Sequence, residues 1–454
     1  MNFNRFVFRS FLTLALTAGL FAGCRKTGID PQPGLVQTGP TYTDVRDSTY
    51  AVAQDMYLWY QNLPSITDFK PQSYESPEAV MVKVRTYSPK TSDGTGHVDR
   101  WSFAVTKQQW NQVVAGSAAG YGFSRAYTTD PNDLRVVFVH PNSPIGQAGV
   151  QRGWRILKYN GISAGAATNQ ALVDAITNTS TGTFEFVTNT GETKTLNLTK
   201  ANYTQSAVLK RTVLDQGGKK VGYLLFNSFN LSSSRRELDE AFAEFKSAGV
   251  ADLVVDLRYN GGGSVAVAER FANLLVPADA AGKLMYTDQH NDKFKSWNRT
   301  RNFDSPLPTN NLGLKRVVFL TTRGSASASE LLINVLRPYM DVKLVGDDTY
   351  GKPVGYYGIP VMDRYVFAVG VKQTNKDGFG DYYEGLKADR KQVDDITRDF
   401  GDPEEASLKD ALTYLRTGSL PARMAARRAA MDAQTLQNEV EPFVGAIQRM
   451  PGQR

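Results

Sequence analysis

The chain of 454 residues contains one cysteine and three histidines. With a single cysteine, Cys24, no intrachain disulfide can form, and neither a cysteine cluster nor an H-E-x-x-H sequence predicts a metal site. The histidines, His97, His140 and His290, stand beside no motif that would complete a Ser-His-Asp triad, so we interpret them as surface or packing residues. The sequences G-x-x-x-x-G-K-[ST] and G-x-G-x-x-G are missing, which argues against a nucleotide cofactor. We therefore expect no cofactor.

Strong charge of one sign is also missing. The formal net charge is +7, and the positive residues are spread along the chain without a Lys/Arg-rich block. This distribution does not predict a nucleic-acid partner. An apolar content of 41% is ordinary for a globular protein, and the length predicts two or three domains.

The first 23 residues have the pattern of a signal peptide. Arg5 and Arg9 precede the apolar run FLTLALTAGLFAG, which is too short for a good membrane span, and small residues precede Cys24. The setting of Cys24 resembles a bacterial lipobox, with Phe21 in place of the usual Leu, and the resemblance implies lipidation at Cys24. The alternative is an ordinary signal peptide followed by an incidental cysteine.

Composition and periodicity divide the rest of the chain. Residues 24–44 are rich in Pro, Gly, Thr and Gln and predict a flexible tether. Apolar residues recur at helical intervals within 45–114, which indicates a small N-terminal helical domain. Strands and amphipathic helices alternate through 206–420, which indicates an α/β sheet with helices on its faces. Residues 421–454 predict a helical tail of no evident chemistry.

The segment 316–354 begins as a buried strand and continues as a helix. Ser325, Ser327 and Ser329 stand at the junction, where unpaired helical N–H groups and the helix dipole favour negative charge. Ser327 and Glu330 also fit a capping box, in which the serine would only satisfy backbone donors. Lys352 lies directly behind a glycine, 25 residues after Ser327.

The sequences SASASE and TYGK around these residues resemble the C-terminal processing (tail-specific) serine peptidases. The resemblance implies that Ser327 is a nucleophile and Lys352 its general base, a role that requires burial to lower the pKa of the lysine. It also implies a core built from the ββα units shared by ClpP and crotonase.

The run DLRYNGGG (256–263) lies between a predicted strand and a predicted helix. In the resembling family such a run lies against the nucleophile, which implies an oxyanion hole formed by Gly262 or Gly263 together with Ala328. Glycine suits this role because no Cβ obstructs the substrate carbonyl.

Residues 115–205 resemble a PDZ domain. Gly120, Tyr121, Gly122 and Phe123 match the loop whose N–H groups receive a peptide's terminal carboxylate. Leu172 and Ile176, four residues apart, would line one wall of a groove beside the binding strand. The resemblance implies recognition of polypeptides through their free C-termini.

The sequence departs from the family near the lysine. Tyr356 stands where a glutamine commonly supports the lysine, and Pro353 stands where a glycine is usual. A tyrosine hydroxyl could donate or accept a hydrogen bond in that role. The departure motivates an alternative, a catalytically inactive peptide-binding scaffold with a PDZ domain. A third interpretation is an acyl-CoA enzyme of the crotonase type.

Together these patterns predict a multidomain α/β protein with a ClpP/crotonase-like core, an inserted PDZ-like β-rich domain and a small N-terminal helical domain. The expected activity is that of a serine endopeptidase acting on polypeptides. The expected location is the bacterial cell envelope, with a lipid anchor to a membrane and the domains facing the periplasm or the cell surface. The oligomeric state is left open.

Overall fold

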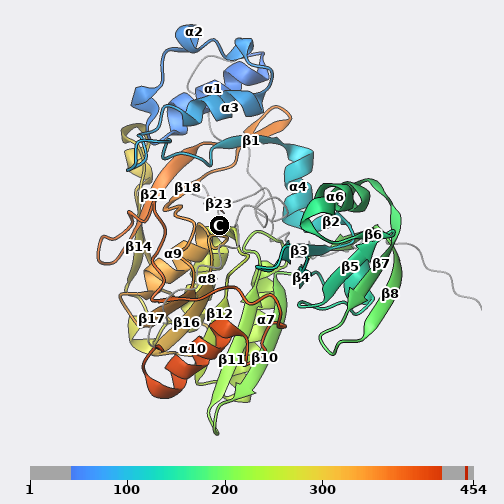
Figure 1. The fold of residues 1–454 in the computed structure, drawn as a ribbon. Helices are drawn as coiled ribbons and strands as arrows, with labels where there is room; N and C mark the ends of the chain where they lie inside the picture. Colours follow the sequence, from blue (N-terminus) through green and yellow to red (C-terminus); the bar gives the residue numbers. More distant parts are fainter. Residues whose placement is uncertain (1–41, 422–444, 448–454) are drawn as a thin grey trace, which may run out of the picture.

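The computed structural model describes residues 42–421 and the backbone of one further strand, Gly445–Ile447. The chain folds into a mixed α/β protein with several sheets (Figure 1). The predicted signal peptide, Cys24 and most of the tether lie outside the described residues, as does most of the predicted helical tail. Within that tail, residues 445–447 form a strand, β23, instead of the helix expected there. No helix in the described part is long and apolar enough to cross a membrane.

The N-terminal helices are α1 (Val45–Met56), α2 (Ile66–Phe69), α3 (Pro77–Arg85) and α4 (Lys107–Ala115). Their apolar faces pack on a sheet of β1 (Phe103–Thr106), β20 (Arg364–Phe367) and β19 (Ile359–Val361). Two of these three strands come from the C-terminal half of the chain. The predicted helical domain at 45–114 therefore has no core of its own, since so short a segment buries too little apolar surface alone.

Residues 117–204 form the β unit, which lies to one side of the main sheet in Figure 1. β2 (Ser117–Gly120) pairs with β9 (Ala201–Thr204). A second sheet joins β3 (Phe123–Tyr127), β4 (Leu134–Val139), β5 (Arg155–Tyr159), β6 (Ile162–Ser163), β7 (Thr181–Val187) and β8 (Thr193–Thr199). Helices α5 (Pro144–Gln147) and α6 (Asn169–Asn178) complete the unit, whose apolar core includes Leu172.

The main sheet has the strand order β10 (Val208–Asp215), β11 (Lys220–Phe226), β12 (Asp252–Asp256), β16 (Arg316–Thr321), β17 (Asp341–Gly346) and β22 (Arg390–Lys391). All neighbours pair in parallel except β10 and β11. Alternate residues of these strands face α7 (Ser234–Ala248), α8 (Val265–Leu275) and α9 (Ala328–Leu336) on one side and α10 (Ala406–Thr417) on the other. The predicted α/β sheet with helices on its faces is thus confirmed.

A further sheet lies over α9. Its order is β13 (Gly262–Ser264), β23, β18 (Val354–Tyr356), β21 (Val369–Asn375), β14 (Leu284–Gln289) and β15 (Thr300–Asn302). The chain leaves the main sheet after β12 to enter β13 and leaves it after β17 to enter β18. These two crossings bring the glycine run and Lys352 to the start of α9.

Candidate active site

Ser327 stands at the turn between β16 and α9 in a strained backbone conformation. Its φ is 59° and its ψ is −107°, a region that residues with a Cβ rarely adopt. Strain of this kind costs of order 1–3 kcal/mol and persists where the surrounding structure enforces it, often at functional sites. Ser327 is 1% exposed, and its Oγ has no hydrogen-bond partner within the ranges that the structure describes.

The neighbouring serines have structural partners. Ser325 Oγ donates to the carbonyl of Leu257 at 2.7 Å, and Ser329 Oγ donates to the carbonyl of Asn260 at 3.0 Å. Both bonds join the start of α9 to the loop after β12. Of the three serines predicted at this junction, Ser327 is therefore the one whose hydroxyl is not used to hold the fold together.

Glu330 connects Ser327 to the lysine segment. The N–H groups of Ser327 and Lys352 donate to the same oxygen, Oε2, at 2.7 and 2.8 Å. The other oxygen, Oε1, accepts from Gly351 N–H at 2.7 Å and from the Thr349 hydroxyl at 2.5 Å. Burial raises the pKa of Glu330, and these four donors act in the opposite direction. The capping glutamate predicted from the sequence thus also positions the backbone of Lys352.

Lys352 is 1% exposed, and burial holds the pKa of its ammonium well below the usual range. The nearby carboxylates of Asp99 and Glu330 oppose this shift, but burial is the larger effect. Nζ lies 3.7 Å from the ring centroid of Tyr356 and 5.7 Å from that of Trp101. Lys352 Nζ therefore lies over the ring of Tyr356, the residue that stands where a glutamine commonly supports the lysine.

Asp99 and Trp101 reach the lysine from the segment before β1. Asp99 Oδ1 accepts from the N–H groups of Trp101 and Ser102 at 2.9 and 3.0 Å, and its Oδ2 accepts from the Tyr57 hydroxyl at 2.9 Å. The N-terminal part of the chain therefore closes one side of the lysine pocket.

Asn260 holds the glycine loop against the serine turn. Its Nδ2 donates to the Phe226 carbonyl at 2.7 Å, and its Oδ1 accepts from Gly262 N–H at 2.9 Å. Its own carbonyl accepts from Ala326 N–H at 3.1 Å. A Cβ placed on Gly262 would lie 2.8 Å from Ala326 O and 3.0 Å from Ser327 Cβ, which is closer than a side chain allows.

The two candidate oxyanion glycines differ in where their N–H groups go. The N–H of Gly262 is used by Asn260. Phe229 pairs with one edge of β13, since its N–H donates to Gly262 O at 3.0 Å and its carbonyl accepts from Ser264 N–H at 3.2 Å. Because neighbouring residues of a strand alternate in the direction of their N–H groups, that of Gly263 faces the opposite edge. The geometry favours Gly263 over Gly262 as an oxyanion donor.

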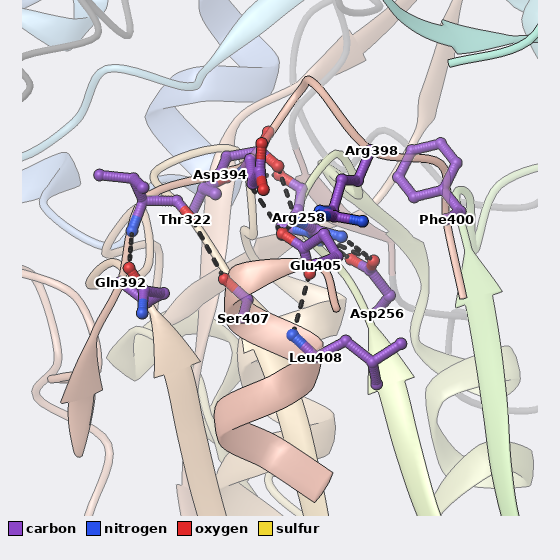
Figure 2. A network of polar contacts seen from close by, with 12 residues as sticks. Asp256, Arg258, Thr322, Gln392, Asp394, Arg398, Phe400, Glu405, Ser407 and Leu408 are labelled. Atoms are coloured by element: carbon purple, nitrogen blue, oxygen red, sulfur yellow. Dashed lines mark hydrogen bonds and ion pairs between the residues drawn. The ribbon is translucent and has the colours of Figure 1, made fainter. Parts of the chain in front are cut away.

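A buried ionic network surrounds Arg258, which precedes the glycine loop in the chain (Figure 2). The Arg258 guanidinium contacts Asp256 at 2.6 Å, Asp394 at 2.6 Å and Glu405 at 2.9 Å. Asp394 also accepts from Arg152 of the β unit at 2.5 Å. The residues just before the glycines are thus fixed to the main sheet, to the start of α10 and to the β unit.

Comparison with known proteins finds a family domain that contains these residues. Residues 220–390 match the model of a family described as peptidase family S41. The chain carries a peptidase S41 domain. The matched residues include Ser327, Lys352 and both candidate glycines. A relative from Staphylococcus saprophyticus, 25% identical over 265 residues that cover 56% of this chain and 50% of the relative, is named a probable CtpA-like serine protease.

Two relatives of the S41 domain are named for C-terminal processing. The chloroplastic C-terminal processing peptidase of Tetradesmus obliquus is 28% identical over 253 residues, which cover 53% of this chain and 52% of the relative. A carboxyl-terminal-processing protease of a Picosynechococcus strain is 25% identical over 245 residues, covering 53% of this chain and 55% of the relative. The chain spans about half the length of these curated relatives.

The chain is also similar to the crystal structure of a Bacteroides fragilis protein assigned to the S41 proteases. It aligns with a TM-score of 0.66 and 26% identity, and the alignment covers 84% of this chain and 99% of that one. Because this share is larger than residues 220–390, the likeness extends beyond the S41 domain.

A cavity of about 710 Å³ connects the β unit to the S41 domain. Gly120, Tyr121, Gly122 and Phe123 line it, together with Ile176, and Gly261 and Gly262 line its other end. Leu172 is absent from its walls because the side chain is fully buried in the core of the β unit. Of the two residues expected on one groove wall, Ile176 lines this cavity and Leu172 lies in the core of the β unit.

The three histidines fall in different places. His97 Nε2 lies 3.2 Å from Lys90 Nζ on the surface, and His290 Nε2 lies 2.7 Å from the Tyr357 hydroxyl. His140 lines the cavity, and burial lowers its pKa to about 4. Among the described residues, no cluster of three or more His, Cys, Asp or Glu side chains is placed to hold a metal ion.

Sequence reasoning missed three residues of the site, Asp99, Trp101 and Asn260, and it missed the second role of Glu330. Asn260 was visible only as part of DLRYNGGG, and no local pattern singled out Asp99 or Trp101. Each contacts residues that are distant in sequence, and the local pattern of apolar and polar residues does not predict such contacts.

Proposed function

We propose that this chain is a serine endopeptidase of the C-terminal processing type, with Ser327 as nucleophile and Lys352 as general base. The observation that carries the proposal is the junction at Glu330, where one carboxylate oxygen holds the backbone of a strained serine and that of a buried lysine. The two crossings between the main sheet and the sheet over α9 support a ClpP/crotonase-like core for the same domain.

The chemistry follows from these groups. The neutral Lys352 amine takes the proton of the Ser327 hydroxyl as Oγ attacks the carbonyl carbon of a peptide bond. The N–H groups of Gly263 and Ala328 stabilise the oxygen that becomes negative. The lysine then gives its proton to the leaving amine, and water hydrolyses the acyl-enzyme by the same route. A lysine with an ordinary pKa would be charged and could not begin this sequence, so its burial is essential.

The β unit suits a PDZ-like role in this proposal. The carbonyls of Tyr121 and Gly122 are used internally, because they accept from Ile145 N–H at 3.1 Å and from His140 N–H at 2.9 Å. These carbonyl oxygens therefore do not repel a carboxylate in the cavity. A polypeptide tail bound at this loop would lie in the cavity that continues to Gly262.

The proposed setting is the bacterial envelope. This location rests on the leader pattern and on the resemblance of the Cys24 segment to a lipobox. The proposed substrates of the peptidase are unfolded polypeptide tails. Metabolic labelling with a palmitate analogue tests the anchor, since Cys24→Ser should remove the label.

A serine-reactive phosphonate distinguishes a peptidase from an inactive scaffold. It should label the wild-type chain once, on Ser327, and should not label Ser327→Ala, while Ser163→Ala, which removes an exposed hydroxyl of β6, should label like wild type. Cleavage of an unfolded protein, followed by mass spectrometry, should be lost with Ser327→Ala and Lys352→Ala. Labelling or cleavage at the wild-type rate in Ser327→Ala would contradict the assignment.

A further inference from the structure

β23 lies between two strands that carry the proposed catalytic groups. It pairs in parallel with β13, where Gly445, Ala446 and Ile447 are opposite Gly262, Gly263 and Ser264. On its other edge it pairs in parallel with β18, where Ala446 and Ile447 are opposite Gly355 and Tyr356. Figure 1 shows β23 beside β18 at the centre of the molecule. In the sheet order β13 and β18 are not neighbours, because β23 separates them.

Both neighbours of β23 begin at the active site. β13 starts at Gly262, next to Ser327, and β18 starts two residues after Lys352. A strand in this position therefore runs past the nucleophile on one edge and continues along the lysine segment on the other.

The register brings the backbone of β23 to the proposed oxyanion donor. Phe229 occupies one edge of β13, so Gly263 directs its N–H and carbonyl toward β23. In a parallel ladder with this register, the N–H of Gly263 is directed to the carbonyl of Gly445 and the carbonyl of Gly263 receives the N–H of Ile447. A peptide carbonyl next to Ser327 and in front of an oxyanion donor has the position of a substrate carbonyl.

We propose that the gap between β13 and β18 is a docking slot for an extended polypeptide, and that the segment around Gly445–Ile447 of this same chain occupies it. The slot adds its guest as a strand through backbone hydrogen bonds, so it accepts varied sequences. It favours small residues opposite Gly262 and Gly355, as Gly445 and Ala446 are here. The segment around Gly445–Ile447 therefore competes with every other polypeptide for the slot. That the segment occupies the position of a substrate rests on the proposed function, but the slot itself does not depend on catalysis.

The competition can be measured without turnover in the full-length Ser327→Ala chain. The probe is a fluorescein-labelled peptide with the sequence of residues 440–450, and its binding is followed by anisotropy. Adding Ile447→Pro removes the N–H that pairs with β13 and should release the slot. A linked segment has an effective concentration near the millimolar range, so the probe should bind the Ile447→Pro chain roughly tenfold or more tightly. Ile447→Val keeps the N–H and should bind the probe like the parent chain.

A second peptide tests the mode of binding. N-methylation of the residue matching Ile447 blocks the same hydrogen bond and should abolish binding to the Ile447→Pro chain. Hydrogen exchange on the wild-type chain needs no variant, and the amide of Ile447 should exchange more slowly than in the isolated peptide. Equal probe affinity for the Pro and Val chains, or exchange of Ile447 at the rate of the isolated peptide, would overturn the proposal. If the phosphonate fails to label Ser327 while these results hold, the proposed function falls and the slot remains.

Discussion

The backbone N–H groups of Ser327 and Lys352 share one acceptor, the Oε2 oxygen of Glu330, at 2.7 and 2.8 Å. Glu330 is fully buried, so neither N–H can turn to water if this oxygen is lost. Glu330 thus fixes the backbones of Ser327 and Lys352 relative to each other.

Glu330→Gln should lower both activity and stability. A glutamine offers one acceptor oxygen in place of two, so at least one buried N–H loses its partner, at about 1–3 kcal/mol of unfolding free energy. Because Lys352 is then less well held, kcat should fall by more than tenfold while peptide binding persists. Urea unfolding and cleavage kinetics measure the two effects. The control is Glu404→Gln, which changes an exposed glutamate, and a Glu330→Gln enzyme with wild-type kcat would contradict the role.

Lys352→Met should abolish cleavage and increase stability at neutral pH. The folded-state pKa of Lys352 is lowered by burial, so between that pKa and the usual lysine pKa the unfolded chain binds more protons than the folded chain. Stability of the wild type therefore rises with pH through this window, and methionine removes the penalty. We expect a gain of about 1–3 kcal/mol at pH 7 that shrinks toward pH 10.

The measurement is urea unfolding of both chains at several pH values. Lys409→Met is the matched control, since Lys409 is exposed and should show no such trend. The cleavage rate should rise with pH as Lys352 loses its proton, and the midpoint of this rise should lie below the usual lysine pKa. The rise should persist when all three histidines are replaced. A stability difference that is constant with pH would mean that Lys352 is not neutral in the folded state.

Gly262→Ala should inactivate the enzyme through contact as well as strain. The new Cβ would lie 2.8 Å from Ala326 O, at a φ of 104°. The backbone conformation alone costs roughly 1–2 kcal/mol, and the overlap must push the glycine loop away from Ser327. We expect kcat to fall at least about a hundredfold, as for loss of an oxyanion donor. Gly218→Ala separates the two effects, because Gly218 has a φ of 86° and open space around its Cβ position.

Tyr356 should act on the lysine through its ring. Nζ lies 3.7 Å from the ring centroid, so Tyr356→Phe, which keeps the ring, should keep the pH profile. Tyr356→Leu removes the attraction of the ring for the ammonium and should move the rise of the rate to lower pH. The pH dependence of kcat/KM for both variants decides between ring and hydroxyl. If Tyr356→Phe shifts the pH at which the rate rises as far as Tyr356→Leu does, the hydroxyl is the supporting group.

Recognition of a tail at Gly120–Phe123 should depend on its terminal charge. Amidating a peptide that ends in an apolar residue should weaken binding by roughly 1.5–3 kcal/mol, the range for hydrogen bonds to charged groups, which is about tenfold to a hundredfold. It should also slow cleavage of a long substrate and spare a short peptide that reaches Ser327 directly. Matched acid and amide substrates measure both rates. Equal rates on the long pair would leave the β unit a structural role.

Local sequence was sufficient for the strand and the helix that carry the candidate site. The strand-to-helix pattern predicted β16 and α9, because apolar periodicity reports burial directly. The motifs around Ser327 and Lys352 pointed to both residues as candidates, and DLRYNGGG pointed to the glycines, because each motif is a short run of neighbouring residues that can be read from the sequence. The capping residue Glu330 was predicted for the same reason.

Only the tertiary structure decided how these groups meet. It assigned the role of Glu330 at Lys352, chose Gly263 over Gly262 through the pairing of Phe229, and removed Leu172 from the groove. It also placed a strand from the far end of the chain between β13 and β18, where a helix had been expected. Pairing partners in a sheet and burial across domains depend on residues distant in sequence. The local periodicity of a segment does not specify them.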